Sequence, residues 1–228
     1  MKMPANDLRA LALWMAIVPL VTFNVSYLIA VAYEHVPACI PYLSGCTSVS
    51  STGRMLPESL VFKAGMLSTV VVVALLWHRS ANFLRSAGQA PLGVNLLRVL
   101  GMLAATSLML YAVILGGKGD ELRLLRRIGI DGFALSNLLI QITFIVLYRP
   151  MRITATQKLF RWLVVICIAL PLLGVAAEVA KAVGMPRRAT NNAVAWNAFV
   201  VVSAYYAVVA RIWWHHGISG GRPTSPSE

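Results

Sequence analysis

The chain has 228 residues, of which 58% are hydrophobic and 12% charged, with a formal net charge of +12. A soluble domain carries about 25% charged residues, so this chain has too little polar surface to cover a water-soluble globule. Its basic residues fall in short clusters between apolar runs, a pattern typical of membrane topology and not of nucleic-acid binding. The apolar runs extend from end to end, so we expect a single domain in a bilayer.

The apolar residues form six segments, each close to the roughly 20 residues that a helix needs to cross a bilayer core of about 30 Å. They are residues 10–32, 59–77, 94–115, 128–148, 162–180 and 193–214. Short connections favour antiparallel neighbours. We therefore predict an all-α, polytopic membrane protein, a six-transmembrane-helix bundle over residues 1–216. Residues 217–228 (GISGGRPTSPSE) have the composition of a disordered tail.

The first segment has two interpretations. Lys2 and Arg9 precede it, and Ala30-Val31-Ala32 satisfies the small-residue rule for signal-peptide cleavage. However, its apolar stretch of about 22 residues exceeds the 7 to 15 of a signal peptide. We favour a retained first helix over a cleaved signal.

The orientation follows from the basic residues. A cytoplasmic N-terminus places eleven of the 20 in inner segments and nine in outer ones, which slightly favours an N-in/C-in topology. The loop 33–57 is then extracytoplasmic. The Ala- and Arg-rich composition suits a bacterium, so we expect the inner membrane.

Three cysteines, Cys39, Cys46 and Cys167, are too few for a disulfide scaffold and have no metal-ligand spacing. Cys39 and Cys46 share the first outer loop, where one bridge forms if the compartment is oxidising. Two free thiols are the alternative.

Four carboxylates are expected at the outer ends of spans, where they would line a polar pocket: Glu34, Glu58, Asp131 and Glu178. Lys63 and Lys181 are the available counter-charges. Ionisable groups at membrane depth usually face a protein interior or a wet cavity. The alternative is that each snorkels to a nearby interface on its own. Pro57-Glu58 is also explained as a helix start, because proline and a carboxylate are both favoured there.

Amides within the apolar segments form a second set: Asn24, Asn137, Gln141 and Asn197. Such groups usually hydrogen-bond across helices as packing contacts. Substrate contact by Asn137 and Asn197 is the alternative.

No metalloprotease, nucleophile-elbow or Walker motif is present. The four histidines are split across the predicted membrane, so no metal site is expected. His35 with Glu34 or Glu58 would form a carboxylate–histidine general base. The candidate catalytic residues are thus Glu58, His35 and Asp131, and no cofactor is indicated.

Residues 41–62 contain Pro41-Tyr42-Leu43-Ser44, Thr52-Gly53, and Pro57-Glu58 before Phe62. With the six-span layout, this pattern resembles the Frag/DRAM/Sfk family, which includes the PGAP-type proteins of GPI-anchor lipid remodelling. The family commonly has Ser-Asp where this chain has Ser44-Gly45. The resemblance implies a membrane protein that handles a lipid or lipid-anchored substrate from the non-cytoplasmic side. It adds Tyr42 and Ser44 to the expected substrate-binding residues.

We therefore expect an integral membrane protein that binds a lipid or lipid-linked substrate in an outward-facing polar pocket. If it is an enzyme, it would be an acyl transferase or hydrolase, although Ser44, Ser59 and Cys46 are merely available as nucleophiles. A non-catalytic assembly partner of another membrane protein is the main alternative. A small-solute transporter is less favoured, because the chain shows no internal repeat.

Overall fold

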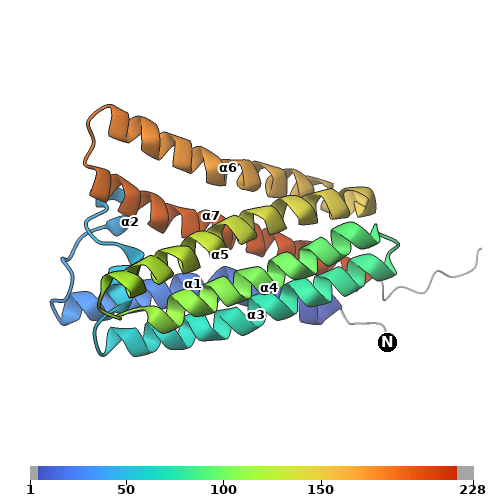
Figure 1. The fold of residues 1–228 in the computed structure, drawn as a ribbon. Helices are drawn as coiled ribbons and strands as arrows, with labels where there is room; N and C mark the ends of the chain where they lie inside the picture. The colour runs from blue at the N-terminus through green and yellow to red at the C-terminus, as the bar shows by residue number, and fades with distance from the viewer. Residues whose placement is uncertain (1–4, 220–228) are drawn as a thin grey trace, which may run out of the picture.

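The computed structural model describes residues 5–219 and is all-helical, with no strand in that range (Figure 1). The long helices are α1 (Ala5–Ala32), α3 (Glu58–Ser86), α4 (Pro91–Ile114), α5 (Asp120–Tyr148), α6 (Gln157–Ala182) and α7 (Arg187–Ser219). All six are long and apolar enough to cross a membrane. Between them lie the short elements α2 (Pro41–Ser44), η1 (Val49–Gly53), η2 (Arg149–Met151) and η3 (Thr154–Thr156).

Each predicted span lies in one of these helices, apart from Leu115, which follows the end of α4. Several helices are longer than the apolar run. Helix α3 continues to Ser86 and α5 begins at Asp120, eight residues before the predicted start at 128. Helix α7 extends to Ser219, so the start of the predicted tail is helical, and residues 220–228 lie outside the described range. The extensions are polar, as expected for helix ends that continue from the hydrocarbon into the headgroup layer.

Local sequence explains where the helices begin and end. Pro91 occupies the first turn of α4, where its missing N–H costs no hydrogen bond. Asp120 and Glu121 lie in the first turn of α5, where the helix dipole favours carboxylates. Gly45 ends α2 with a φ of 58°, a conformation that glycine adopts without strain. These signals place the chain reversals at the two ends of the bundle.

Five of the six long helices form the body of the bundle. Helix α1 packs against α3 and α7, and α4 lies between α3 and α5. Helix α6 packs along α7 but diverges from α5 away from its Gln157 end (Figure 1). Large apolar side chains such as Leu28, Val71, Val99 and Val146 are exposed on the outside. In a bilayer these side chains face lipid, which is as apolar as they are.

An aromatic and amide cluster joins α3, α5 and α7 inside the bundle. The Trp77 Nε1–H donates to the Tyr206 hydroxyl at 3.3 Å, and that hydroxyl donates to Asn137 Oδ1 at 2.9 Å. The Tyr205 hydroxyl donates to the backbone oxygen of Gln141 at 3.2 Å. Asn137 and Gln141 therefore lie one turn apart on the buried face of α5, and Asn137 acts as a cross-helix contact.

Helices α4 and α5 approach closely at two glycines. A Cβ atom added at Gly129 would lie 2.8 Å from the Tyr111 backbone nitrogen and 3.0 Å from the Ser107 backbone oxygen. A Cβ atom at Gly132 would instead meet the Ser107 Oγ, at 2.8 Å. The first contact is with backbone and the second with a small side chain that can rotate. Small residues thus allow the two backbones to approach, as is common between membrane helices.

We expect Gly129→Ala to lower the free energy of unfolding by about 1–3 kcal/mol, because α4 and α5 must move apart. Gly132→Ala is the matched control and should cost much less, because the Ser107 side chain can move. Thermal unfolding of the two purified variants in detergent measures the difference. Equal stability of both variants would contradict the close backbone contact at Gly129.

Candidate functional site

The loop between α1 and α3 closes one end of the bundle. A disulfide joins Cys39 and Cys46, whose Cα atoms are 6.7 Å apart. The Tyr27 hydroxyl donates to the Cys39 backbone oxygen at 2.7 Å and accepts from the Cys39 N–H at 2.9 Å. The Trp196 Nε1–H, fully inside the bundle, donates to the Thr47 backbone oxygen at 3.0 Å. Side chains of α1 and α7 therefore hold the loop in place.

Three predicted binding residues belong to this closure. Asn197 donates to the Tyr42 backbone oxygen at 2.8 Å, and the Tyr42 hydroxyl exchanges hydrogen bonds with Asn24 at 2.9 and 3.1 Å. Ser44 is exposed, and its hydroxyl donates to the Ile40 backbone oxygen at 2.9 Å. Substrate contact by Tyr42, Ser44 and Asn197 stays a prediction; in the structure they shape the loop.

Glu58 and His35 form a pair beneath the loop, in which only Glu58 is buried. Glu58 begins α3 and is 0% exposed, and its Oε1 lies 2.8 Å from Nδ1 of His35. The His35 side chain is 25% exposed, so it lies between the carboxylate and the solvent. Among the residues described, Oε2 of Glu58 has no hydrogen-bond partner.

The contact between Oε1 of Glu58 and Nδ1 of His35 determines which atom donates and which accepts the hydrogen bond. A carboxylate only accepts hydrogen bonds, so an ionised Glu58 receives the Nδ1–H of His35. In the neutral imidazole the Nε2 atom then carries the lone pair, the arrangement in which a carboxylate orients a histidine base. His35 and Glu58, rather than His35 and Glu34, therefore make the carboxylate–histidine pair.

The other predicted carboxylates do not gather around Glu58. Glu34 is exposed just after α1 ends, and Glu178 is exposed on α6, where it pairs with Lys181 at 2.5 Å. Because α6 diverges from α5, Glu178 lies on the far side of the bundle from Glu58. Lys63 is half-buried on α3 and makes no ion pair within the described residues.

Asp131 lies deeper than expected. We placed it in the first turn of its helix, but α5 begins at Asp120, so Asp131 is about 16 Å from the helix start at 1.5 Å per residue. It is exposed on the outer surface of α5. The start was misplaced because the segment from 120 to 127 is too polar for an apolar-run criterion. Contact of Asp131 with substrate stays a prediction.

Arginines, not carboxylates, line the largest cavity at this end. The cavity has a volume of about 770 Å³ and lies between η1, α5 and the start of α7. Its basic lining residues are Arg54, Arg123, Arg126, Arg127 and Arg188, and we call it the arginine cavity. Ser48, Ser50 and Tyr111 contribute hydroxyls, and Phe199 and Ile130 are among its apolar residues.

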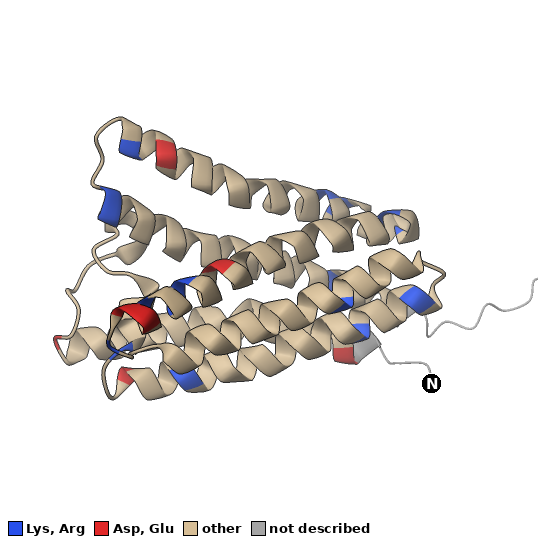
Figure 2. Ribbon diagram, in the orientation of Figure 1, with Lys and Arg blue, Asp and Glu red and all other residues tan. Residues whose placement is uncertain are grey.

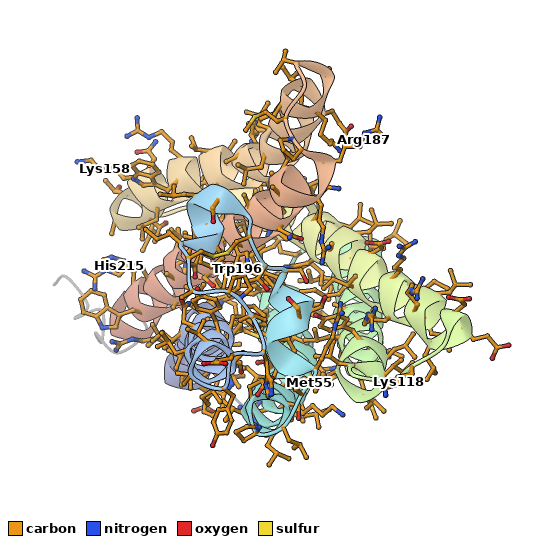
Figure 3. The ribbon with its side chains drawn as sticks, turned by 90° about the vertical axis from the view of Figure 1, so that its left-hand side faces the viewer. Met55, Lys118, Lys158, Arg187, Trp196 and His215 are labelled. Atoms are coloured by element: carbon orange, nitrogen blue, oxygen red, sulfur yellow. A yellow bond between two sulfur atoms is a disulfide. The ribbon has the colours of Figure 1, made fainter. Side chains whose placement is uncertain are left out.

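Figure 2 shows the charged residues toward the two ends of the bundle, except along the first half of α5. Figure 3 looks onto the loop end, where Trp196 lies near the centre and α6 projects away from the other helices. The arginine cavity lies at this end, and α6 contributes none of its lining residues.

The charges in the arginine cavity affect one another. Burial lowers the pKa of Arg54, and the positive charges of Arg126, Arg188 and Arg123 lower it further, against an opposing effect of Tyr111. Only Arg123 has an ion-pair partner among the described residues, Asp120 at 3.3 Å. The cavity is therefore strongly electropositive.

The sequence contained a signal for this site that we did not use. Arg123, Arg126, Arg127 and Ile130 follow the i, i+3, i+4, i+7 spacing of one helix face. Leu124, Leu125 and Ile128 are exposed on the opposite face. Since our predicted span started at 128, these arginines were counted as loop residues.

Within residues 5–219 no group of three or more His, Cys, Asp or Glu side chains is arranged to hold a metal ion. The fold defines an integral membrane protein with six candidate spans and a disulfide-closed loop over one end. The chain matches no protein-family model, no curated protein and no solved structure.

We expect His35→Ala to lower the free energy of unfolding by about 3 kcal/mol at neutral pH, because it leaves the buried Glu58 charge without a partner. Adding Glu58→Met should restore most of that loss, because both members of the pair are then replaced. Thermal unfolding in detergent measures both effects. His78→Ala, an exposed histidine on α3, is the control. A double variant less stable than His35→Ala would contradict the pairing.

Proposed function

We propose that the chain spans a bacterial inner membrane with both termini in the cytoplasm and the loop 33–57 outside. The Cys39–Cys46 disulfide supports this orientation, because disulfides form and persist in oxidising compartments. The arginine cavity would then open toward the extracytoplasmic leaflet.

We further propose that the protein binds a lipid or lipid-linked substrate in the arginine cavity. The observation that carries this proposal is the position of the cavity. Its α5 arginines lie about 5 to 10 Å from the helix start at 1.5 Å per residue. Helix α5, at about 43 Å, exceeds a 30 Å core by roughly 7 Å at each end. With α5 centred in the bilayer, the cavity would lie at the boundary between headgroups and hydrocarbon.

The lining of the arginine cavity suits an amphipathic ligand. Its arginines and hydroxyls provide donors for a polar headgroup, whereas Ile130 and Phe199 provide apolar surface nearby. A second, apolar cavity of about 190 Å³ lies between α2, α6 and α7, with Leu43, Leu173 and Val194 in its wall. Its lining suits a hydrocarbon chain.

The pattern at residues 41–62 agrees with a lipid substrate. These residues carry the resemblance to the Frag/DRAM/Sfk family, and they include α2, η1 and Glu58. Ser48 and Ser50 from this stretch line the arginine cavity. The resemblance and the cavity therefore support the same end of the bundle as the substrate side.

The proposed orientation predicts which end of the helix bundle reacts with a reagent added outside the cell. We expect Lys118→Cys, in the turn before α5, to react with a membrane-impermeant maleimide in intact spheroplasts. Ser86→Cys, at the opposite end of α3, should react only after the membrane is broken. Both variants are made in a Cys167→Ala background, which leaves the disulfide in place. Labelling of Ser86→Cys alone in intact spheroplasts would reverse the proposed orientation.

Lipid binding is tested by native mass spectrometry of the full-length protein after gentle extraction. We expect the wild type to retain a lipid. Ala195→Trp should lose it, because the larger side chain fills the arginine cavity. Ala207→Trp is the matched control: it lies on the same helix, is exposed on the outside, and should retain the lipid.

Retention of a stoichiometric protein and no lipid by the wild type would contradict the proposal and favour an assembly role. Equal lipid retention by the wild type and both tryptophan variants would show that the lipid lies elsewhere. Folding of each variant is checked by its thermal unfolding before the spectra are compared.

A further inference from the structure

The arginines of the arginine cavity point in the unusual direction for basic residues at a membrane interface. An isolated interfacial arginine extends outward to water or headgroups. On α5 the basic residues instead share the face that lines the cavity, while Leu124, Leu125 and Ile128 are exposed on the other side. The positive charges of these side chains repel one another, and a negative charge in the cavity would offset that repulsion.

The described part of the chain does not supply that charge. Arg54, Arg126, Arg127 and Arg188 make no ion pair with any carboxylate in that part, and the one pair, Arg123–Asp120, is exposed on both sides. No acidic residue lines the cavity. An anion from outside the described residues would supply the negative charge.

The hydroxyl of a buried tyrosine points to a ligand in the same place. Tyr111 is 3% exposed and lines the cavity, and its hydroxyl has no hydrogen-bond partner among the described residues. The Ser50 hydroxyl, which accepts from Arg54 at 3.2 Å, also lines the cavity. Arginine forks and hydroxyl donors together match the oxygen atoms of a phosphate, which accepts several hydrogen bonds at once.

We propose that the arginine cavity is a binding site for a phosphate group, held by Arg54, Arg126 and Arg188 with a hydrogen bond from Tyr111. For the source of the phosphate this inference rests on the proposed function, in which the group belongs to a lipid headgroup. A free phosphate or pyrophosphate ion offers the same chemistry and is the other source. The phosphate would neutralise charges that come from three separate elements, η1–α3, α5 and α7.

The chain offers a closely matched pair of variants. Arg188 lines the cavity, whereas Arg187, one residue earlier in α7, does not (Figure 3 shows Arg187 at the rim of the bundle). Arg188→Gln and Arg187→Gln remove the same charge from the same helical turn. Arg126→Gln removes a second cavity charge from α5.

The experiment measures binding to delipidated full-length protein in detergent. The probes are phosphatidylglycerol, diacylglycerol with the same acyl chains, and inorganic pyrophosphate. Native mass spectrometry measures lipid binding, and the ligand-induced rise in unfolding temperature measures all three probes. We expect phosphatidylglycerol to bind at least tenfold more tightly than diacylglycerol to the wild type and to Arg187→Gln. Arg188→Gln and Arg126→Gln should each lose about tenfold in phosphatidylglycerol affinity.

The stability of the unliganded protein distinguishes a purely structural role of the arginines from a role in binding. If they hold a phosphate, Arg126→Gln should be as stable as the wild type or more so without ligand, because repulsion is relieved. A loss of unliganded stability together with an unchanged ligand-induced shift would overturn the inference.

The outcomes separate this inference from the proposed function. Equal binding of phosphatidylglycerol and diacylglycerol, unaffected by the arginine variants, overturns the phosphate site and leaves lipid binding intact. A pyrophosphate-induced shift that Arg188→Gln abolishes, without binding of either lipid, supports the phosphate site and refutes the proposed lipid source. No response to any of the three probes overturns both.

Discussion

Hydrocarbon offers no hydrogen-bond partner to a backbone amide, and this constraint governs the whole chain. Inside the apolar layer each segment must satisfy its own N–H and C=O groups, which only a continuous helix achieves in an all-α protein. Irregular backbone is therefore confined to the ends. At the loop end even the irregular segment is tied down, because Tyr27, Asn197 and Trp196 reach out of their helices to bond it. These hydrogen bonds fix the loop over the end of the bundle.

At the loop end, Glu58 and the cavity arginines are accommodated near the apolar medium in two different ways. Glu58 is fully buried and receives a hydrogen bond from His35 within the chain. Of the arginines that line the cavity, only Arg123 has a carboxylate partner among the described residues, and burial together with like charges lowers the pKa of Arg54. A buried charge with its own partner stabilises a fixed geometry, whereas converging charges without one create affinity for a ligand. This contrast leads us to associate Glu58 with the shape of the loop and the arginines with binding.

The two features are mechanically connected. Phe62 lies one turn after Glu58 on α3, and its ring packs against Tyr111 with centroids 6.3 Å apart. A Cβ atom at Gly53 would overlap the Phe62 ring, so η1 rests directly on this side chain. Tyr111 lines the arginine cavity on the other side. Movement of the loop over Glu58 would therefore shift one wall of the cavity.

The sequence by itself determined the helical class, the six spans and the membrane setting, because hydropathy summed over about 20 contiguous residues depends on no tertiary contact. It also brought Cys39 and Cys46 into one loop, and it named His35 and Glu58 as candidates for a pair. Only the tertiary structure decided that His35 meets Glu58 rather than its neighbour Glu34. It also decided that Glu178, on the diverging α6, stays apart, and that arginines from η1, α5 and α7 converge. Those outcomes depend on the rotation of each helix about its axis and on the spacing between helices. Both are set by packing among residues distant in the chain, which no local pattern records.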